Sequence, residues 1–149
     1  MKVYIGSDHR GYHLKEEILN SLRIKKIRVE DMGAYKFDKD DDYTLYAEKV
    51  AVMVKDSPGA LGILLCGSGV GVEVVANKFD GIRASIAKNY EQVIAGRRDD
   101  DMNVLVIAAD FTTYDEAKKI VQGFLKSSFS GLKRHRRRLE EIKNIEANN

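Results

Sequence analysis

Cys66 opens a glycine-rich segment, CGSGVG at residues 66–71, that lies between an apolar run and a stretch with helical spacing. The three glycines let the backbone turn tightly and point several N–H groups at one anion. A helix N-terminus close to a cysteine lowers the pKa of its thiol toward neutrality. The pattern therefore predicts a thiolate beside an anion-binding loop, acting either as a nucleophile or as a general base with an oxyanion hole.

The spacing of this segment separates it from better-known glycine motifs. Its glycines follow GxGxG, whereas a dinucleotide-binding loop has GxGxxG and a nucleotide P-loop continues with Gly-Lys-Ser or Gly-Lys-Thr. Position 66 is Cys and not Gly, which excludes the GxSxG nucleophile elbow. Two plainer interpretations stay open: a glycine turn that only joins a strand to a helix, and a cysteine that is only a small buried apolar residue.

Two other groups of residues have types suited to phosphate binding or proton transfer. Asp8 and His9 directly follow the first apolar run, where a histidine can contact a phosphate, shuttle a proton near neutral pH, or simply lie on the surface. In the basic run KRHRRR at 133–138, Arg134 and Arg138 are four residues apart and share one helix face, as a clamp for a phosphate dianion requires. The sequence after this run turns acidic, so a solvated basic face is the other interpretation.

The chain also predicts the scaffold that must position these residues. Short apolar runs alternate with stretches of helical spacing, which is typical of a parallel sheet covered by helices on both faces. We expect about five strands, at residues 3–5, 27–29, 61–66, 82–87 and 103–109. The expected helices carry Leu14 to Leu22 and Leu45 to Val54, followed by helices at about 70–78, 89–97, 113–126 and 132–146. The prediction is one doubly wound α/β domain over residues 1–149.

In such a sheet, ligands bind at the carboxyl ends of the strands. Asp8-His9 follows the first expected strand, CGSGVG the third and Asp110 the fifth, so all three should meet at one edge. The composition, 44% hydrophobic and 32% charged residues, is ordinary for a globular domain, and the net charge of +2 indicates no particular partner. A single cysteine cannot form an intrachain disulfide, which together with the lack of a long apolar stretch predicts a cytoplasmic protein that binds no membrane.

Five segments together resemble one family of enzymes. From Met1 to about Ile145, the chain resembles ribose-5-phosphate isomerase B and its galactose-6-phosphate isomerase relatives. The segments that carry this resemblance are GSDHRGYHLKEEI, DYTLYA, LLCGSGVGVEVVANKFDGIRA, NVLVIA and RHRRRLEEI. The resemblance implies a three-layer Rossmann-like sandwich and a homodimer or dimer of dimers with active sites at subunit interfaces. It also implies an enzyme of the pentose phosphate pathway that interconverts ribose 5-phosphate and ribulose 5-phosphate through an enediolate, without a metal or an organic cofactor.

The resemblance implies roles for single positions as well. Cys66 matches the base that takes the C2 proton of the open-chain sugar, and the glycine-rich loop matches the one that holds the enediolate oxygens. Arg134 and Arg138 match the arginines that bind the phosphate. The expected catalytic residues are Cys66, Ser68 and Asp99. The expected substrate-binding residues are Asp8, His9, Tyr43, Gly67, Ser68, Gly69, Val70, Gly71, Asp100, Arg134 and Arg138.

One departure from the family concerns the opening of the sugar ring. Asp99 and Asp100 stand where the family usually has a His-Asn pair, whose histidine donates a proton to the ring oxygen. An ordinary aspartate is protonated in only about one molecule in a thousand at pH 7. Asp99 can therefore replace the histidine only if burial or neighbouring carboxylates raise its pKa. Otherwise ring opening falls to His9 or Ser68, or is left to the spontaneous reaction.

Another departure is Asp110, which stands where many relatives carry an arginine and would repel a phosphate if it pointed inward. The extra charges of Arg136 and Arg137 are the expected compensation. These changes keep two other functions open: isomerisation of a six-carbon sugar phosphate, such as allose 6-phosphate or galactose 6-phosphate, and non-catalytic binding of a phosphosugar. Nucleic-acid binding through residues 133–138 is disfavoured because no aromatic residues interleave with the basic ones.

Overall fold

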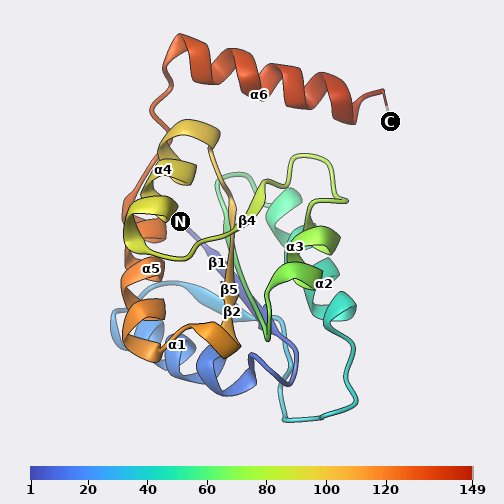
Figure 1. Ribbon diagram of the computed structural model, residues 1–149, viewed down its shortest axis with the longest axis vertical. Helices are drawn as coiled ribbons and strands as arrows, with labels where there is room; N and C mark the ends of the chain where they lie inside the picture. The colour runs from blue at the N-terminus through green and yellow to red at the C-terminus, as the bar shows by residue number, and fades with distance from the viewer. Residues whose placement is uncertain (149) are drawn as a thin grey trace.

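The computed structural model describes residues 1–148 and contains a five-stranded, wholly parallel sheet (Figure 1). The strands are β1 Val3–Ser7, β2 Val29–Asp31, β3 Leu61–Cys66, β4 Ala84–Ile86 and β5 Val104–Ala108. Their order across the sheet is β2-β1-β3-β5-β4. From β1 the chain first adds β2 on one side, then adds β3 on the other side, continues to the edge strand β4 and returns to place β5 between β3 and β4. This two-sided arrangement confirms the predicted doubly wound α/β class.

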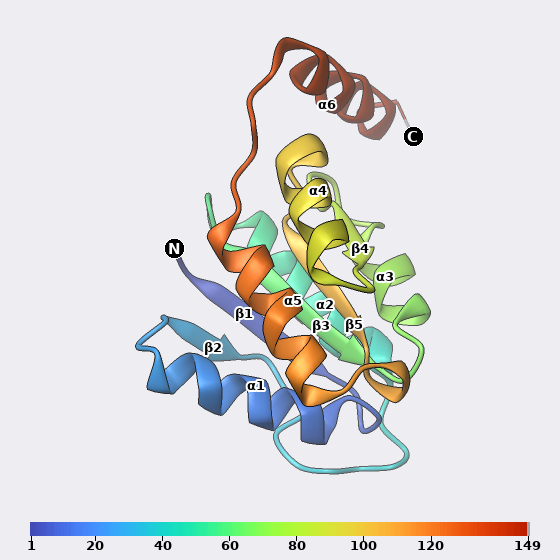
Figure 2. The same cartoon turned by 60° about the vertical axis from the view of Figure 1, so that its left-hand side comes forward.

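Helices cover both faces of the sheet, which gives the three layers that were predicted (Figure 2). On one face lie α1, α4 and α5, and on the other lie α2 and α3. The helices are α1 Tyr12–Ile24, α2 Tyr43–Lys55, α3 Val70–Ala76, α4 Tyr90–Asp100, α5 Tyr114–Lys126 and α6 Lys133–Glu146, with a short 3-10 turn at Ala109–Phe111. None of the helices in the described chain is long and apolar enough to cross a membrane.

The central strand β3 is apolar along its whole length because both of its faces are covered. Leu61, Ile63 and Leu65 pack under the layer of α1, α4 and α5. Leu64 and Cys66 point the other way, into the layer of α2 and α3. The strand is therefore fixed from both sides up to Cys66, the residue at its carboxyl end.

Most elements differ from their predicted bounds by one to three residues, and two of these differences have a clear local reason. β2 begins at Val29, two residues later than predicted, because the Ile27 N–H donates to the Leu22 carbonyl at the end of α1 and not to a strand. The helix predicted at 89–97 continues to Asp100, so most of the acidic run at 99–101 is helical and not a turn. It ends at Asp101, whose φ of 47° is left-handed.

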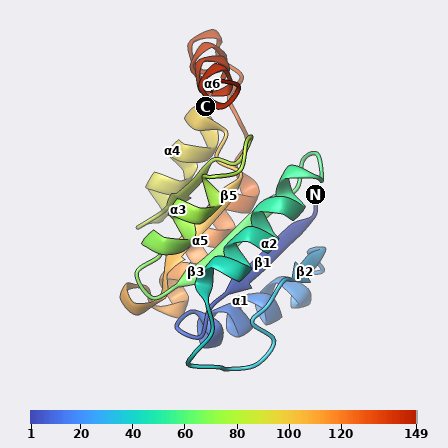
Figure 3. The ribbon, with the colours of Figure 1, turned by 90° about the vertical axis from the view of Figure 1, so that its right-hand side faces the viewer.

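The helix α6 lies beyond the end of the sheet where the strands begin (Figures 1 and 3). The C-terminal end of α4 leads to the start of β5, and α6 contacts this end through His135 and Asp99. The other end of α6 contacts the loop before β4, where the Gly81 N–H donates a hydrogen bond to Glu146 Oε1 at 2.9 Å. The carboxyl ends of β1 and β3 lie at the other end of the sheet. The basic run at 133–138 is therefore far from Cys66 within one chain.

Lys15 holds the segment after β2 against α1 from a position with no solvent exposure. Its Nζ donates to both carboxylate oxygens of Asp31 at 2.8 Å and to the Ala34 carbonyl at 2.9 Å. A buried cation and anion that satisfy each other are tolerated, but removal of one leaves the other unpaired in a low-dielectric interior. This contact fixes the start of the chain that leads toward α2 and the candidate site.

We expect Lys15→Met to lower the free energy of unfolding by about 1–3 kcal/mol, because Asp31, whose side chain is 16% exposed, loses its cation and keeps only the hydrogen bond from the Gly33 N–H. Denaturation by urea, followed by circular dichroism, measures this loss. The matched control is Lys119→Met on the exposed face of α5, for which we expect a change of at most about 0.5 kcal/mol. Equal effects for the two variants would contradict the structural role of the buried pair.

Candidate active site

The candidate site lies where β1 and β3 end side by side. The strand register pairs Ser7 with Leu65, so the next residues, Asp8 and Cys66, lie next to each other. The Cys66 Sγ donates a hydrogen bond to Asp8 Oδ2 at 3.2 Å, and the Gly11 N–H donates to Asp8 Oδ1 at 3.1 Å. Asp8 is 3% exposed and Cys66 is 7% exposed. The structure thus places a thiol and a carboxylate in direct contact at a nearly buried position.

The expectation of a lowered thiol pKa at Cys66 is wrong for the chain without a ligand. Burial, then the hydrogen bond and the negative charge of Asp8, raise the pKa of Cys66 to about 11. Backbone N–H groups of Gly69 and Gly67 act in the opposite direction, as the dipole argument requires, but they are outweighed. The resting site therefore holds a protonated thiol next to a proton acceptor.

The glycine-rich loop adopts the tight turn that its sequence predicts. Gly69 has a φ of 77°, a left-handed conformation that favours glycine, and α3 begins at the next residue. A Cβ atom at Gly71 would lie 2.7 Å from the ring of Tyr43, so this glycine lets the tyrosine approach the loop. Ser68 is exposed at the tip of the loop, and its Oγ accepts a hydrogen bond from the Val70 N–H at 3.4 Å.

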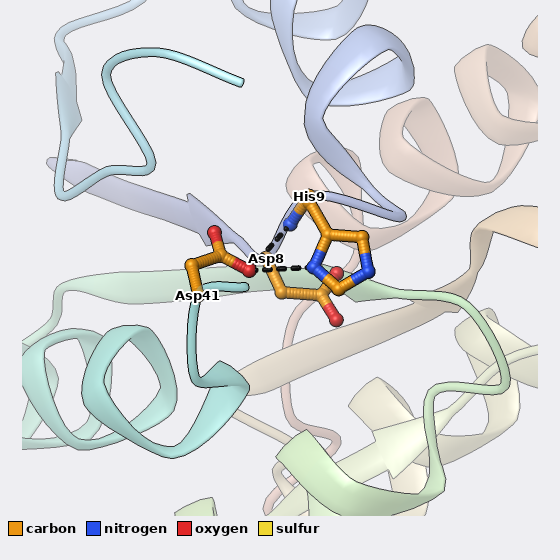
Figure 4. A group of neighbouring side chains, drawn as sticks. All are labelled: Asp8, His9 and Asp41. Atoms are coloured by element: carbon orange, nitrogen blue, oxygen red, sulfur yellow. Dashed lines mark hydrogen bonds and ion pairs between the residues drawn. The ribbon is translucent and has the colours of Figure 1, made fainter. Parts of the chain in front are cut away.

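His9 is held in place by Asp41, a residue to which the sequence assigned no role. The Asp41 Oδ1 accepts from the backbone N–H of His9 at 3.0 Å and lies 2.6 Å from its Nδ1 (Figure 4). The Asp41 side chain is only 7% exposed, and its Oδ2 is buried without a hydrogen-bond partner. Only the fold distinguishes Asp41 from its neighbours in the acidic run at 38–42, because the others remain at the surface or cap α2.

Asp8, His9 and Asp41 also offer the kind of atoms that bind metal ions. One ligand atom from each lies within 4.8 Å of the other two. Most of these atoms already serve other partners: both Asp8 oxygens and Asp41 Oδ1 accept the hydrogen bonds described above. The cluster is better suited to orient the imidazole of His9 than to wrap around an ion.

Arg10 is a second residue that the sequence did not single out. Its guanidinium lies so close to Gly67 that any side chain at that position would collide with it. Its Nη2 donates to Asp110 Oδ2, and the Asp110 N–H donates to the Gly67 carbonyl at 3.1 Å. The charge of Asp110 is thus compensated by Arg10. Arg136 and Arg137, the expected compensation, lie on α6 at the other edge of the sheet, where Arg137 pairs with Glu141.

The remaining predicted residues form a separate group around the start of α6. The Arg98 guanidinium donates to both carboxylate oxygens of Asp99 at 2.7 and 2.9 Å and holds the pKa of that carboxyl below its usual range. The condition for Asp99 as a proton donor, a raised pKa, is therefore not met. The Nε of Arg134 donates to Nε2 of His135, a ring that is 3% exposed and lies 2.8 Å from Ser130 Oγ.

The predicted site residues therefore fall into two groups, one at the carboxyl ends of the strands and one near their amino ends. The first group gathers around the carboxyl ends of β1 and β3 and contains Asp8, His9, Tyr43, Cys66, Gly67, Ser68, Gly69, Val70 and Gly71. The second lies at the end of α4 and on α6 and contains Asp99, Asp100, Arg134 and Arg138. One copy of the chain does not bring a thiol and a phosphate clamp together.

Comparisons with known proteins agree on one family. A family model described as Ribose/Galactose Isomerase matches residues 3–142. The probable ribose-5-phosphate isomerase B of Mycoplasma genitalium is 43% identical over 141 residues, which are 94% of this chain and 92% of the relative. Ribose-5-phosphate isomerase B of Escherichia coli is 37% identical over 97% of this chain and 96% of its own.

Solved structures give the same result. The structure of ribose-5-phosphate isomerase B from Mycoplasma genitalium with bound ribulose 5-phosphate has a TM-score of 0.94 at 40% identity and covers 99% of this chain and 97% of its own. That of ribose-5-phosphate isomerase B from Clostridium thermocellum has a TM-score of 0.95 at 38% identity and covers 99% of both chains.

The contact between Asp8 and Cys66 can be tested without a substrate. Asp8→Asn removes the negative charge that helps to raise the thiol pKa and replaces one carboxylate oxygen with an N–H donor, so we expect the pKa of Cys66 to fall below its value of about 11. Because the thiolate is the reactive form, alkylation by iodoacetamide at pH 8 should become about tenfold faster for each unit by which the pKa falls. Asp80→Asn, at an exposed site, is the control. Unchanged alkylation in Asp8→Asn would contradict this account of the raised pKa.

Proposed function

The chain belongs to the ribose/galactose isomerase family of sugar-phosphate isomerases, and we propose that it interconverts ribose 5-phosphate and ribulose 5-phosphate through an enediolate. The observation that carries this proposal is the contact of Cys66 with Asp8 at the mouth of the glycine-rich loop. A base and a set of anion-binding N–H groups next to each other are what an enediolate requires. A lone buried cysteine also fits a reducing compartment, and we assign the enzyme to the cytoplasm.

We assign Cys66 as the base and Asp8 as the group that accepts its proton. When Asp8 takes the thiol proton, Sγ becomes a thiolate and removes the C2 proton of the open-chain aldose. The electron pair of the C2–H bond forms the C1–C2 double bond, and the carbonyl pair moves to O1. Sγ then returns its proton to C1, while the O2–H proton passes to O1 and C2 becomes the ketone. In this proposal, the backbone N–H groups of residues 67–71 stabilise the oxyanion that develops.

A second copy of the chain supplies the phosphate clamp in this proposal. Arg134 and Arg138 lie at the edge of the sheet opposite to Cys66, so a two-fold dimer has to bring α6 of one copy over the loop of the other. Exposed apolar side chains lie on both surfaces that would meet, Val70 and Val74 on α3 and Ile145 on α6. Such side chains favour association.

His135 prepares Arg134 for this role. Its ring accepts from the Arg134 Nε, so the two terminal nitrogens of the guanidinium are the ones directed to a ligand. The imidazole is itself fixed, because its Nδ1 lies 2.8 Å from Ser130 Oγ and 3.7 Å from Asp99 Oδ1. An arginine held in this way loses less side-chain entropy when it binds a phosphate.

The direct test is turnover of ribose 5-phosphate by the wild type and by Cys66→Ala. We expect the variant to lose at least about 10³-fold in kcat, because it lacks the group that takes the C2 proton in this proposal. Calorimetry should show that the variant still binds ribose 5-phosphate. Allose 6-phosphate, assayed in parallel, reports on the six-carbon alternative. Binding without turnover in the wild type would instead indicate a phosphosugar-binding protein.

The shared site makes a separate prediction for mixed subunits. Cys66→Ala and Arg134→Ala/Arg138→Ala should each be inactive alone, since every site of either dimer carries a defect. After the two are unfolded together and refolded, half of the dimers should be mixed and contain one intact site. Activity should then recover to about a quarter of the wild-type value per site. If each chain contains its whole site, the mixture will stay inactive.

A further inference from the structure

We propose that His9, oriented by Asp41, is the acid that opens the sugar ring in this chain. The inference rests on the proposed function, since it names the residue that prepares the substrate for Cys66. A pentose 5-phosphate with an aldehyde at C1 is mostly closed into a furanose by bonding of the C4 oxygen to C1. Removal of the C2 proton needs the open aldehyde, so the enzyme gains from a group that protonates the ring oxygen.

The other candidates for this acid are poorly placed or carry the wrong charge. Asp99 is ionised because Arg98 donates two hydrogen bonds to it, and an ionised carboxylate has no proton to give. This holds for either copy in a dimer, since the pair lies within one chain. Ser68 has a hydroxyl that is a very weak acid, and it lies exposed at the tip of the loop.

The geometry around His9 is that of an oriented acid. Asp41 Oδ1 accepts from the backbone N–H of His9 and lies 2.6 Å from its Nδ1, which fixes the ring with Nε2 turned away from Asp41 (Figure 4). Phe37 packs its ring edge-on against the imidazole, at 6.3 Å between centroids. The buried carboxylate of Asp41 compensates the positive charge of the imidazolium. Since the His9 side chain is 26% exposed, water can return its proton after each turnover.

Asp8 connects this acid to the base. One of its oxygens accepts from Cys66 Sγ, and its carboxylate lies within 4.8 Å of the ligand atoms of His9 and Asp41. His9 and Cys66 therefore flank the same carboxylate at the same edge of the sheet. In this proposal, a five-membered sugar ring binds next to Asp8 with its ring oxygen toward His9 and its C2 toward Cys66.

The step balances with water as the only co-reactant. Nε2–H of the imidazolium gives its proton to the ring oxygen as the bond between C1 and that oxygen breaks. The O1–H proton passes to water, its electron pair forms the C1–O1 double bond, and the open aldehyde results. His9 is then neutral, with Nδ1–H still donating to Asp41, and takes a proton back from water.

The experiment separates ring opening from enediolate chemistry. Ribulose 5-phosphate stays open, because the hydroxyl that would close its ring carries the phosphate. Exchange of its C1 proton in D₂O therefore needs Cys66 but no ring opening. We expect His9→Gln and Asp41→Asn to lower kcat for ribose 5-phosphate by about 100-fold while C1 exchange changes by less than about threefold. Asp41→Asn should leave KM nearly unchanged, as befits a residue that positions His9.

Three controls decide the outcome. His13→Gln and Asp40→Asn, at exposed neighbouring positions, should leave both reactions unchanged. Cys66→Ala should lose both reactions. Equal losses of turnover and exchange in His9→Gln, or a rise in KM alone, would show that His9 only binds the substrate and would overturn the proposal. If the wild type itself catalyses neither reaction, the proposed function fails, which is a different result.

Discussion

The hydrogen bond from Cys66 to Asp8 depends on one property of the sheet: β1 and β3 are parallel neighbours in a register that pairs Ser7 with Leu65. Between these strands the direction of chain winding reverses, so their following loops diverge and leave an open crevice at the carboxyl ends. The same burial that fixes the two side chains raises the pKa of the thiol. A base at this position works only with an acceptor for its proton, and Asp8 is in contact with it. Fold, burial and chemistry are thus joined in a single contact.

The carboxylates around this contact are all engaged, which matters for a site that is to receive an anion. Asp8 accepts hydrogen bonds from the Cys66 thiol and the Gly11 N–H. Asp41 binds His9, and Asp110 forms an ion pair with Arg10. Paired in this way, their charges oppose a phosphate much less than free carboxylates would. Arg10 supplies its charge from the loop after β1, next to Gly67, and pairs with Asp110 beside the glycine-rich loop.

The sequence predicted those features that depend on local patterns. The apolar runs of β3 and β5 and the glycine-rich loop follow from burial on both faces and from backbone geometry, and both are present. Asp41 and Arg10 were missed because their roles arise from partners 32 and 100 residues away in the chain. The thiol pKa was predicted in the wrong direction, since the dipole of a nearby helix is visible in a sequence whereas burial and the Asp8 contact are not.

The predicted site residues lie at the two opposite ends of the strands. In the proposed dimer, the two copies of the chain therefore have different tasks at each active site. The base, its proton acceptor and the oriented imidazole come from the strand ends of one chain, where hydrogen bonds hold them without help from a partner. In the proposed dimer the partner contributes the arginines of α6, and His135, which binds Arg134, is already buried in the single chain. Dimerisation then completes phosphate binding and not the proton-transfer machinery. On the proposed mechanism, binding of the phosphate holds the reacting carbons against Cys66, so catalysis depends on the dimer through positioning. With an ionised Asp99 on the partner, ring opening has to remain with the chain that carries the thiol.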